Sequence, residues 1–180
     1  MKRTFVAVGV IVVLFAGILH AQAPKLYPEL KKLEPLVGEW IDEGEAKATP
    51  LGPAGKFTQR FSIKWIHAGF FLEWHFSSKG PWGENEGTEV DGYDPVNKTF
   101  PGRWWTTDGN MTSGTYTPNG RVITFLGTVT TAKEKHELRQ TYNFAADLMS
   151  YTFKSEISLD GKTWILETES KGTKVKPTQK

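Results

Sequence analysis

The sequence contains no cysteine. A disulfide scaffold, a thiolate metal site and a cysteine nucleophile are therefore excluded, and so is a lipoprotein anchor. Catalytic motifs are also missing: there is no Gly-x-Ser-x-Gly elbow, no glycine-rich phosphate loop before a helix and no metal-binding motif. The fold must be held by its hydrophobic core alone, and the length is adequate for that.

No apolar run reaches the length of about 20 residues that a comfortable membrane span needs. The run at residues 5–19 has 15 residues, follows two basic residues and precedes Ala-Gln-Ala at residues 21–23. This order is typical of a secretory signal peptide. We predict that residues 1–23 are removed, with the cut after Ala21 or Ala23, from a periplasmic or secreted protein. A retained N-terminal anchor is the alternative.

An excess of one charge is also missing. The chain has 22 basic and 20 acidic residues, and residues 1–23 carry two of the basic ones and none of the acidic ones. The remaining chain is therefore balanced at 20 of each sign. A neutral surface argues against binding to nucleic acid or to an anionic membrane. We expect no nucleic-acid partner and no stable membrane span after processing, and the sequence leaves the oligomeric state open.

Helical patterns are nearly absent from the rest of the chain. Residues 24–36 form the one plausible helix, with Leu26, Leu30 and Leu33 at helical spacing and Pro35 at its end. After it come about ten short segments with strand character, separated by turn residues. They cover residues 38–48, 57–65, 70–76, 88–93, 102–107, 111–117, 122–129, 136–144, 149–159 and 163–170.

Short, regularly spaced strands joined by tight turns are typical of an antiparallel meander that closes into a barrel or sandwich. We predict an all-β fold, an up-and-down β-barrel of about ten strands with one short N-terminal helix. Residues 24–172 form the barrel domain and residues 173–180 a flexible tail. A barrel of this size has a lumen that side chains do not readily fill, so it can hold a small ligand.

Several motifs follow one another in a characteristic order. Leu-Val-Gly-Glu-Trp stands at residues 36–40, Gly-Phe-Phe at 69–71, Asp-Gly-Tyr-Asp-Pro at 91–95, and a strand with two tryptophans precedes Thr-Asp-Gly at 107–109. This set resembles an uncharacterised bacterial family, a domain of unknown function with a lipocalin-like (calycin) β-barrel, over roughly residues 33–170. The resemblance implies a tryptophan, Trp40, across the closed end of the barrel with the helix beneath it. It extends at fold level to nitrobindin-like haem barrels.

Two features depart from these relatives. Lipocalin-like barrels usually end with an arginine packed over the first-strand tryptophan, and residues 164–170 contain none. Nitrobindin-like proteins carry a late histidine for haem iron, whereas the last histidine here is His136. We therefore expect neither haem nor another cofactor.

Acid–base candidates have simpler explanations. His67, His75 and His136 lack the spacing of common metal sites. Asp94 before proline and Asp108 before glycine suit turns, and the glutamates at 84, 86 and 89 suit a solvated loop and strand face. We therefore predict no metal and no catalytic residue. An enzyme that uses Asp108 or His75 as acid or base at the barrel mouth is the alternative.

Aromatic residues give the strongest functional signal, since they make up 13% of the chain. They suit either a filled core, as in a structural or interaction module, or a lumen lined by rings and a few polar groups. We favour non-covalent binding of a small, mostly apolar ligand, or of a carboxylate-bearing one if an arginine lies inside. One of Trp104 and Trp105 must face inward, because neighbouring strand residues point to opposite faces. The predicted ligand-binding residues are Trp74, Arg103, Trp104, Trp105, Asp108, Tyr116, Arg139 and Tyr142, with Gln140 as a further polar contact.

Overall fold

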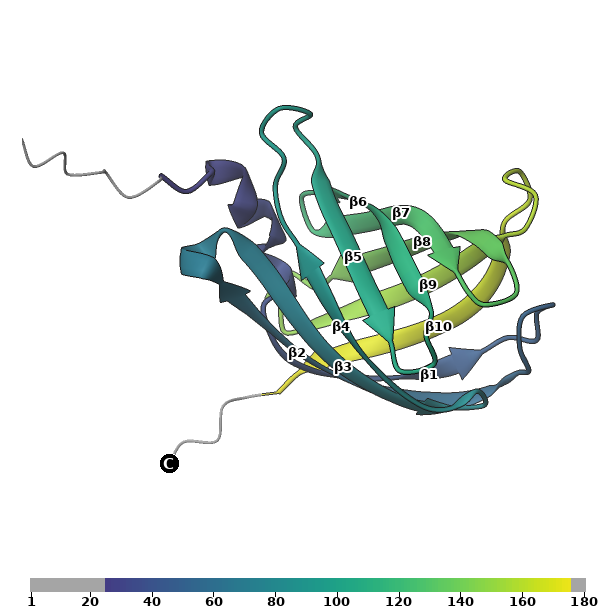
Figure 1. The fold of residues 1–180 in the computed structure, drawn as a ribbon. Helices are drawn as coiled ribbons and strands as arrows, with labels where there is room; N and C mark the ends of the chain where they lie inside the picture. The colour runs from purple at the N-terminus through teal and green to yellow at the C-terminus, as the bar shows by residue number, and fades with distance from the viewer. Residues whose placement is uncertain (1–24, 176–180) are drawn as a thin grey trace, which may run out of the picture.

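Ten antiparallel strands close into a barrel in the structure, a computed structural model that describes residues 25–175 (Figure 1). Each strand pairs with its neighbour in the chain, and β1 pairs with β10 to close the ring. The predicted ten-stranded up-and-down barrel is confirmed. The strands are β1 (Gly38–Ala46), β2 (Gly55–Ile66), β3 (Phe71–Gly80), β4 (Gly83–Asp91), β5 (Phe100–Thr106), β6 (Met111–Asn119), β7 (Val122–Thr130), β8 (Lys135–Phe144), β9 (Ser150–Ser158) and β10 (Ile165–Lys174).

The N-terminal helix is a 3-10 helix, η1 (Pro28–Leu36), and a second short one, η2 (His67–Gly69), joins β2 to β3. Side chains three residues apart lie above one another in a 3-10 helix. The buried stripe is therefore Leu30, Leu33 and Leu36, whereas Leu26, predicted to belong to the apolar face, is 46% exposed. None of the helices within residues 25–175 is long and apolar enough to cross a membrane.

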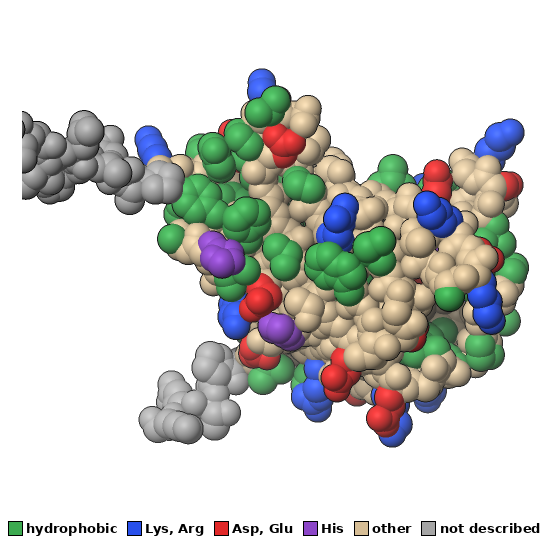
Figure 2. Space-filling view, viewed as in Figure 1, with side chains coloured by type: hydrophobic (Ala, Val, Ile, Leu, Met, Phe, Trp, Pro, Cys, Tyr) green, Lys and Arg blue, Asp and Glu red, His purple; other side chains and the backbone are tan. Residues whose placement is uncertain are grey.

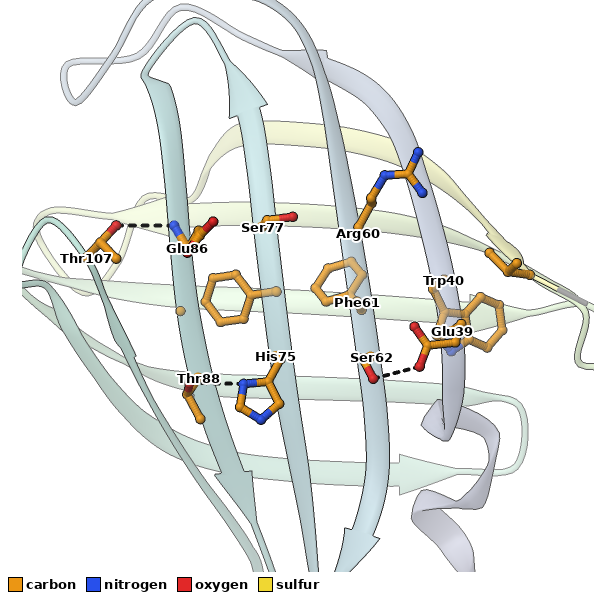
Figure 3. A pocket seen from close by; sticks show the side chains of 13 residues that line it. Glu39, Trp40, Arg60, Phe61, Ser62, His75, Ser77, Glu86, Thr88 and Thr107 are labelled. Carbon is orange, nitrogen blue, oxygen red and sulfur yellow. Dashed lines mark hydrogen bonds between the residues drawn. The ribbon is translucent and has the colours of Figure 1, made fainter. Parts of the chain in front are cut away.

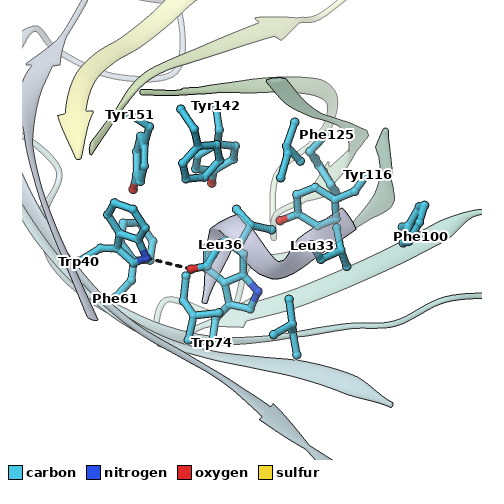
Figure 4. Packing of buried hydrophobic residues seen from close by; sticks show 14 of the residues in the cluster. Leu33, Leu36, Trp40, Phe61, Trp74, Phe100, Tyr116, Phe125, Tyr142 and Tyr151 are labelled. Carbon is cyan, nitrogen blue, oxygen red and sulfur yellow. Dashed lines mark hydrogen bonds between the residues drawn. The ribbon is translucent and has the colours of Figure 1, made fainter. Parts of the chain in front are cut away.

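Trp40 lies where η1 closes one end of the barrel. Its indole Nε1 donates a hydrogen bond of 2.8 Å to the carbonyl oxygen of Leu36, and its ring is buried (Figure 4). The ammonium of Lys174, at the end of β10, lies 5.0 Å from the centre of that ring. Lys174 therefore lies over Trp40, where lipocalin-like barrels usually carry an arginine, and it stands four residues beyond residues 164–170.

Aromatic rings of the inner wall pack over glycines of the neighbouring strands. Phe76 faces Gly87 on the neighbouring strand, and Tyr151 faces Gly172 in the same way. A Cβ at Gly87 would lie 2.3 Å from the Phe76 ring, and one at Gly172 would lie 2.2 Å from the Tyr151 ring. The rings therefore occupy the space that a side chain would otherwise take, which packs a wide barrel tightly.

Candidate functional site

The tandem tryptophans of β5 point to opposite sides of the wall. Trp104 faces the lumen, where its ring centre lies 4.9 Å from that of Phe125, and Trp105 faces solvent with 45% of its surface exposed. The prediction that one of the two faces inward is confirmed. The inward side of β5 is continuous from Phe100 through Gly102, so Pro101 causes no break in the alternation.

Three other predicted ligand residues also face the lumen. Trp74, Tyr116 and Tyr142 are 1%, 2% and 4% exposed, respectively, and belong to the buried aromatic cluster (Figure 4). Gln140 points inward as well and is partly buried, since it pairs with inward-facing Phe125 across β7 and β8.

The two predicted arginines lie outside the barrel, which corrects the expectation that they line the lumen. Arg103 is an exposed outward residue of β5. Arg139 also points outward; its Nε donates a hydrogen bond of 2.8 Å to Glu156 Oε2, and its guanidinium lies 4.4 Å from the ring centre of Trp164. The reason for expecting a carboxylate-bearing ligand is therefore lost.

The candidate acid–base residues lie on the surface. Asp108 sits in the exposed β5–β6 turn, where its carboxylate accepts hydrogen bonds from the Thr106 hydroxyl and from the side-chain amide of Asn110, the latter at 2.8 Å. These hydrogen bonds are typical of an aspartate that stabilises a turn. His75 points outward from β3, with its Nε2 3.2 Å from Glu73 Oε2.

Buried acids are the part of the interior that sequence reasoning missed. Glu89, predicted to be solvated, is 5% exposed, and Asp91 is fully buried. Tyr116 donates its hydroxyl to Glu89 Oε1 at 2.7 Å, and Trp74 Nε1 donates to Asp91 Oδ2 at 2.6 Å. Loss of solvation raises the pKa of both carboxyl groups. The two-residue turn between Gly80 and Gly83 was the available signal, because it pairs these acids with the inward face of β3.

A third buried acid lies on the other side of the lumen. Asp42 of β1 is 2% exposed and accepts hydrogen bonds from Tyr151 Oη at 2.6 Å and from Ser170 Oγ at 3.1 Å. Burial raises its pKa to about 6, although both hydrogen bonds act in the opposite direction. Glu167 adds a fourth, partly buried carboxyl group, which accepts from Ser155 Oγ at 3.0 Å. The lumen therefore presents hydrogen-bond acceptors rather than cations.

Most of the inner wall is buried, and this includes the end away from η1, where Ile157 is fully buried. A few inward side chains are more exposed. Phe76 and Trp104 face the lumen toward the β3–β4 and β5–β6 turns, and both are only partly buried while packing against the core cluster. Gln59 of β2, which pairs with Asp42, is also partly exposed. These three side chains, two rings and one amide, form the partly exposed patch of the inner wall.

His136 is the histidine of the interior. It is 9% exposed, and its Nδ1 has no hydrogen-bond partner among the described residues; the nearest carboxylate, Glu134 Oε1, is 3.9 Å away. Burial lowers its pKa, so the ring is neutral at neutral pH. Within residues 25–175, no group of three or more histidine, aspartate or glutamate side chains is arranged to hold a metal ion.

Two grooves lie on the outer surface of the barrel. One, of about 580 Å³, crosses β1 to β4 and is walled by polar side chains such as Arg60, Ser62 and His75 (Figure 3). The other, of about 710 Å³, lies on β1 to β3 beside Glu43 and Lys56. Both are open to solvent and lack the enclosing apolar walls of an ordinary small-molecule site. Charged side chains of both signs are interspersed over the face shown in Figure 2, with no field of one sign.

Comparisons with known proteins agree with this architecture. The sequence profile of a family described as a protein of unknown function (DUF1579) matches residues 27–173. No curated protein matches the chain. Two similar solved structures are Rv2717c from M. tuberculosis (TM-score 0.62, 16% identity, 84% of this chain and 100% of that one) and the S-type phycobiliprotein lyase CPES from Guillardia theta (TM-score 0.55, 13% identity, 82% of this chain and 93% of that one). At these identities the likeness shows the fold alone.

Proposed function

Since this chain belongs to the DUF1579 family, whose function is unknown, we propose a function from its own geometry. The protein is an exported barrel that binds a small, mostly apolar ligand non-covalently in its lumen, against the partly exposed patch of the inner wall. The observation that carries this proposal is the pair of inward rings, Phe76 and Trp104, that remain partly exposed in an otherwise tightly packed interior. Apolar walls with a few polar groups are the usual make-up of a small-molecule site.

The charges of the wall define the ligand further. The inward carboxyl groups, those of Asp42, Glu89, Asp91 and Glu167, accept hydrogen bonds, and Gln59 can both donate and accept. The one inward cation described above, Lys174, lies over Trp40 at the closed end. The ligand is therefore neutral or cationic, with N–H or O–H donors, because an anion would be repelled once any of these acids ionises.

The direct test compares the two adjacent tryptophans. Nile red, a neutral apolar probe, is titrated into the protein and into Trp104→Ala, with Trp105→Ala as the matched control because that ring faces solvent. Loss of one aromatic contact, worth about 0.5–1.5 kcal/mol, weakens binding about two- to tenfold. We expect this for Trp104→Ala and an unchanged Kd for Trp105→Ala.

A second variant guards against misfolding of Trp104→Ala. Gln59→Trp adds a ring to the partly exposed patch without removing core packing. It should also weaken binding of the probe, because the added ring occupies space in the lumen. Binding that is absent in the unmodified protein, or that is equal in both tryptophan variants, contradicts the proposal. Absence of binding would favour the alternative of a structural module with a filled core.

Export is the second part of the proposal and rests on residues 1–23, which lie outside the described residues. The full chain is expressed in a Gram-negative host, and the mass of the periplasmic protein is measured. A mass lower by residues 1–21 or 1–23 supports cleavage after Ala21 or Ala23. Full-length protein that stays with the membrane fraction supports the retained anchor instead.

A further inference from the structure

Glu89 and Asp91 form an acid pair on the inner face of β4. They are two residues apart, so their side chains leave the strand on the same side. A Cβ placed on Gly102 of the adjacent strand would lie 2.6 Å from Asp91 Oδ1 and 3.3 Å from Glu89 Oε1, so both carboxyl groups converge over that glycine. Each carboxyl group shifts the pKa of the other, as expected of close neighbours.

One oxygen of the pair is left without a donor. Trp74 and Tyr116 satisfy one oxygen of Asp91 and one of Glu89, but Asp91 Oδ1 is fully buried and has no hydrogen-bond partner among the described residues. A buried acceptor without a donor costs about 1–3 kcal/mol. A proton on one of the two carboxyl groups is the simplest hydrogen-bond donor for this oxygen.

Within residues 25–175, no cation lies close enough to shift the pKa of either acid. The groups around the pair are the Trp74 indole from β3, Gly102 from β5, the Tyr116 phenol from β6 and the Tyr142 phenol from β8, and Asp42 of β1 is a further acid beyond Tyr142. Two ionised carboxylates side by side, desolvated and without a counter-charge, are prohibitively unfavourable.

We propose that the acid pair holds one proton at neutral pH, shared as a hydrogen bond between Asp91 and Glu89 that satisfies Asp91 Oδ1. The stability of the core then depends on pH, because the same two groups hold the indole of Trp74 and the phenol of Tyr116 in place. This inference does not depend on the proposed ligand.

The acid pair makes the stability of the fold decrease as pH rises. In the unfolded chain both carboxyl groups ionise near pH 4, whereas burial raises the pKa of both in the folded barrel. Unfolding therefore releases a proton, and the contribution to stability is fully present below about pH 4 and is lost as pH rises through the folded pKa. Over that interval the folding equilibrium constant falls by up to tenfold per pH unit.

Three other groups also link folding to pH. Burial raises the folded pKa of Asp42 to about 6 and also raises the pKa of Glu167, so both change stability with the same sign as the acid pair. His136 has a lowered folded pKa, so it destabilises the fold as pH falls below about 6.5, the value of an unperturbed histidine. Between about pH 6.5 and 8 the contribution of the acid pair is therefore the slope that is lost when the pair alone is replaced.

Urea unfolding across this window tests the proposal. The chain is compared with the double variant Glu89→Gln/Asp91→Asn, in which two amides reproduce the neutral pair, and with Glu86→Gln, an exposed outward residue of the same strand. The folding constant of the chain and of Glu86→Gln should fall with pH more steeply than that of the double variant, by up to a further tenfold per pH unit. Equal slopes in the chain and the double variant overturn the proposal.

An infrared spectrum gives a test that needs no variant to fold. At pH 7.5 the folded chain should show the carbonyl stretch of a protonated carboxylic acid, which disappears when the protein is unfolded in urea at the same pH. A folded chain without that band contains two ionised carboxylates, and the proposal is then wrong.

Discussion

Gly102→Ala is expected to destabilise the barrel through crowding alone. Gly102 does not have a positive φ, so its backbone suits any residue. The added methyl carbon, however, would lie 2.6 Å from Asp91 Oδ1 and 2.8 Å from Tyr116 Cε2, well inside contact distance. Neither neighbour can move freely, because each is held by a buried hydrogen bond.

The size of the effect follows from overpacking. Extra methyl groups in a tightly packed core cost about 1–3 kcal/mol. For a chain of this length, 1 kcal/mol lowers Tm by about 2–4 °C, so we expect a decrease of about 2–12 °C in a calorimetric scan. Gly52→Ala is the control, since a Cβ there meets nothing within 4 Å. If the Tm of Gly102→Ala equals the Tm of Gly52→Ala and of the unmodified chain, the acid pair is not packed against Gly102 and the reasoning is refuted.

Two further substitutions probe the closed end and the acid pair. Trp74→Phe keeps a ring in the core but removes the donor to Asp91 Oδ2, and it should cost about 1–3 kcal/mol in urea unfolding, because a buried acceptor loses its donor; a cost near zero would mean that this bond does not form. Lys174→Met keeps the aliphatic stem over Trp40 but removes the cation, and it should cost about 0.5–1 kcal/mol. The exposed neighbour Lys171→Met is its control and should cost nothing, and equal losses in both would contradict a specific role for Lys174.

The barrel could be predicted because about ten short segments with strand character follow one another, each separated from the next by turn residues. The clearest is β2, where Phe57, Phe61 and Ile63 are buried between more exposed polar residues. The type of helix was harder to predict from the sequence. Leucine spacing of three is compatible with both an α-helix and a 3-10 helix, and proline at both ends of η1 favoured the tighter form.

The burial of Glu89 and Asp91 could not be predicted from the sequence, for a physical reason. In β4 both faces carry carboxylates, outward Glu84 and Glu86 and inward Glu89 and Asp91, so hydropathy does not distinguish inside from outside. Only the register of the β3–β4 hairpin separates them, and register depends on turn geometry. The outward direction of Arg103 was missed because the sequence did not show which of Trp104 and Trp105 faces inward; with Trp104 inside, its neighbour Arg103 lies outside.

Because β1 pairs with β10 to close the ring, the complete barrel cannot form until the last strand is present. Trp40 pairs with Lys174, and Asp42 accepts a hydrogen bond from Ser170, 128 residues away. Until β10 has left the ribosome, β1 and β9 both present unpaired edges, and the core beneath them stays open to water. A nascent chain of this design therefore remains loosely structured for most of its synthesis, and a deletion of a few residues from β10 should cost the whole barrel rather than one strand.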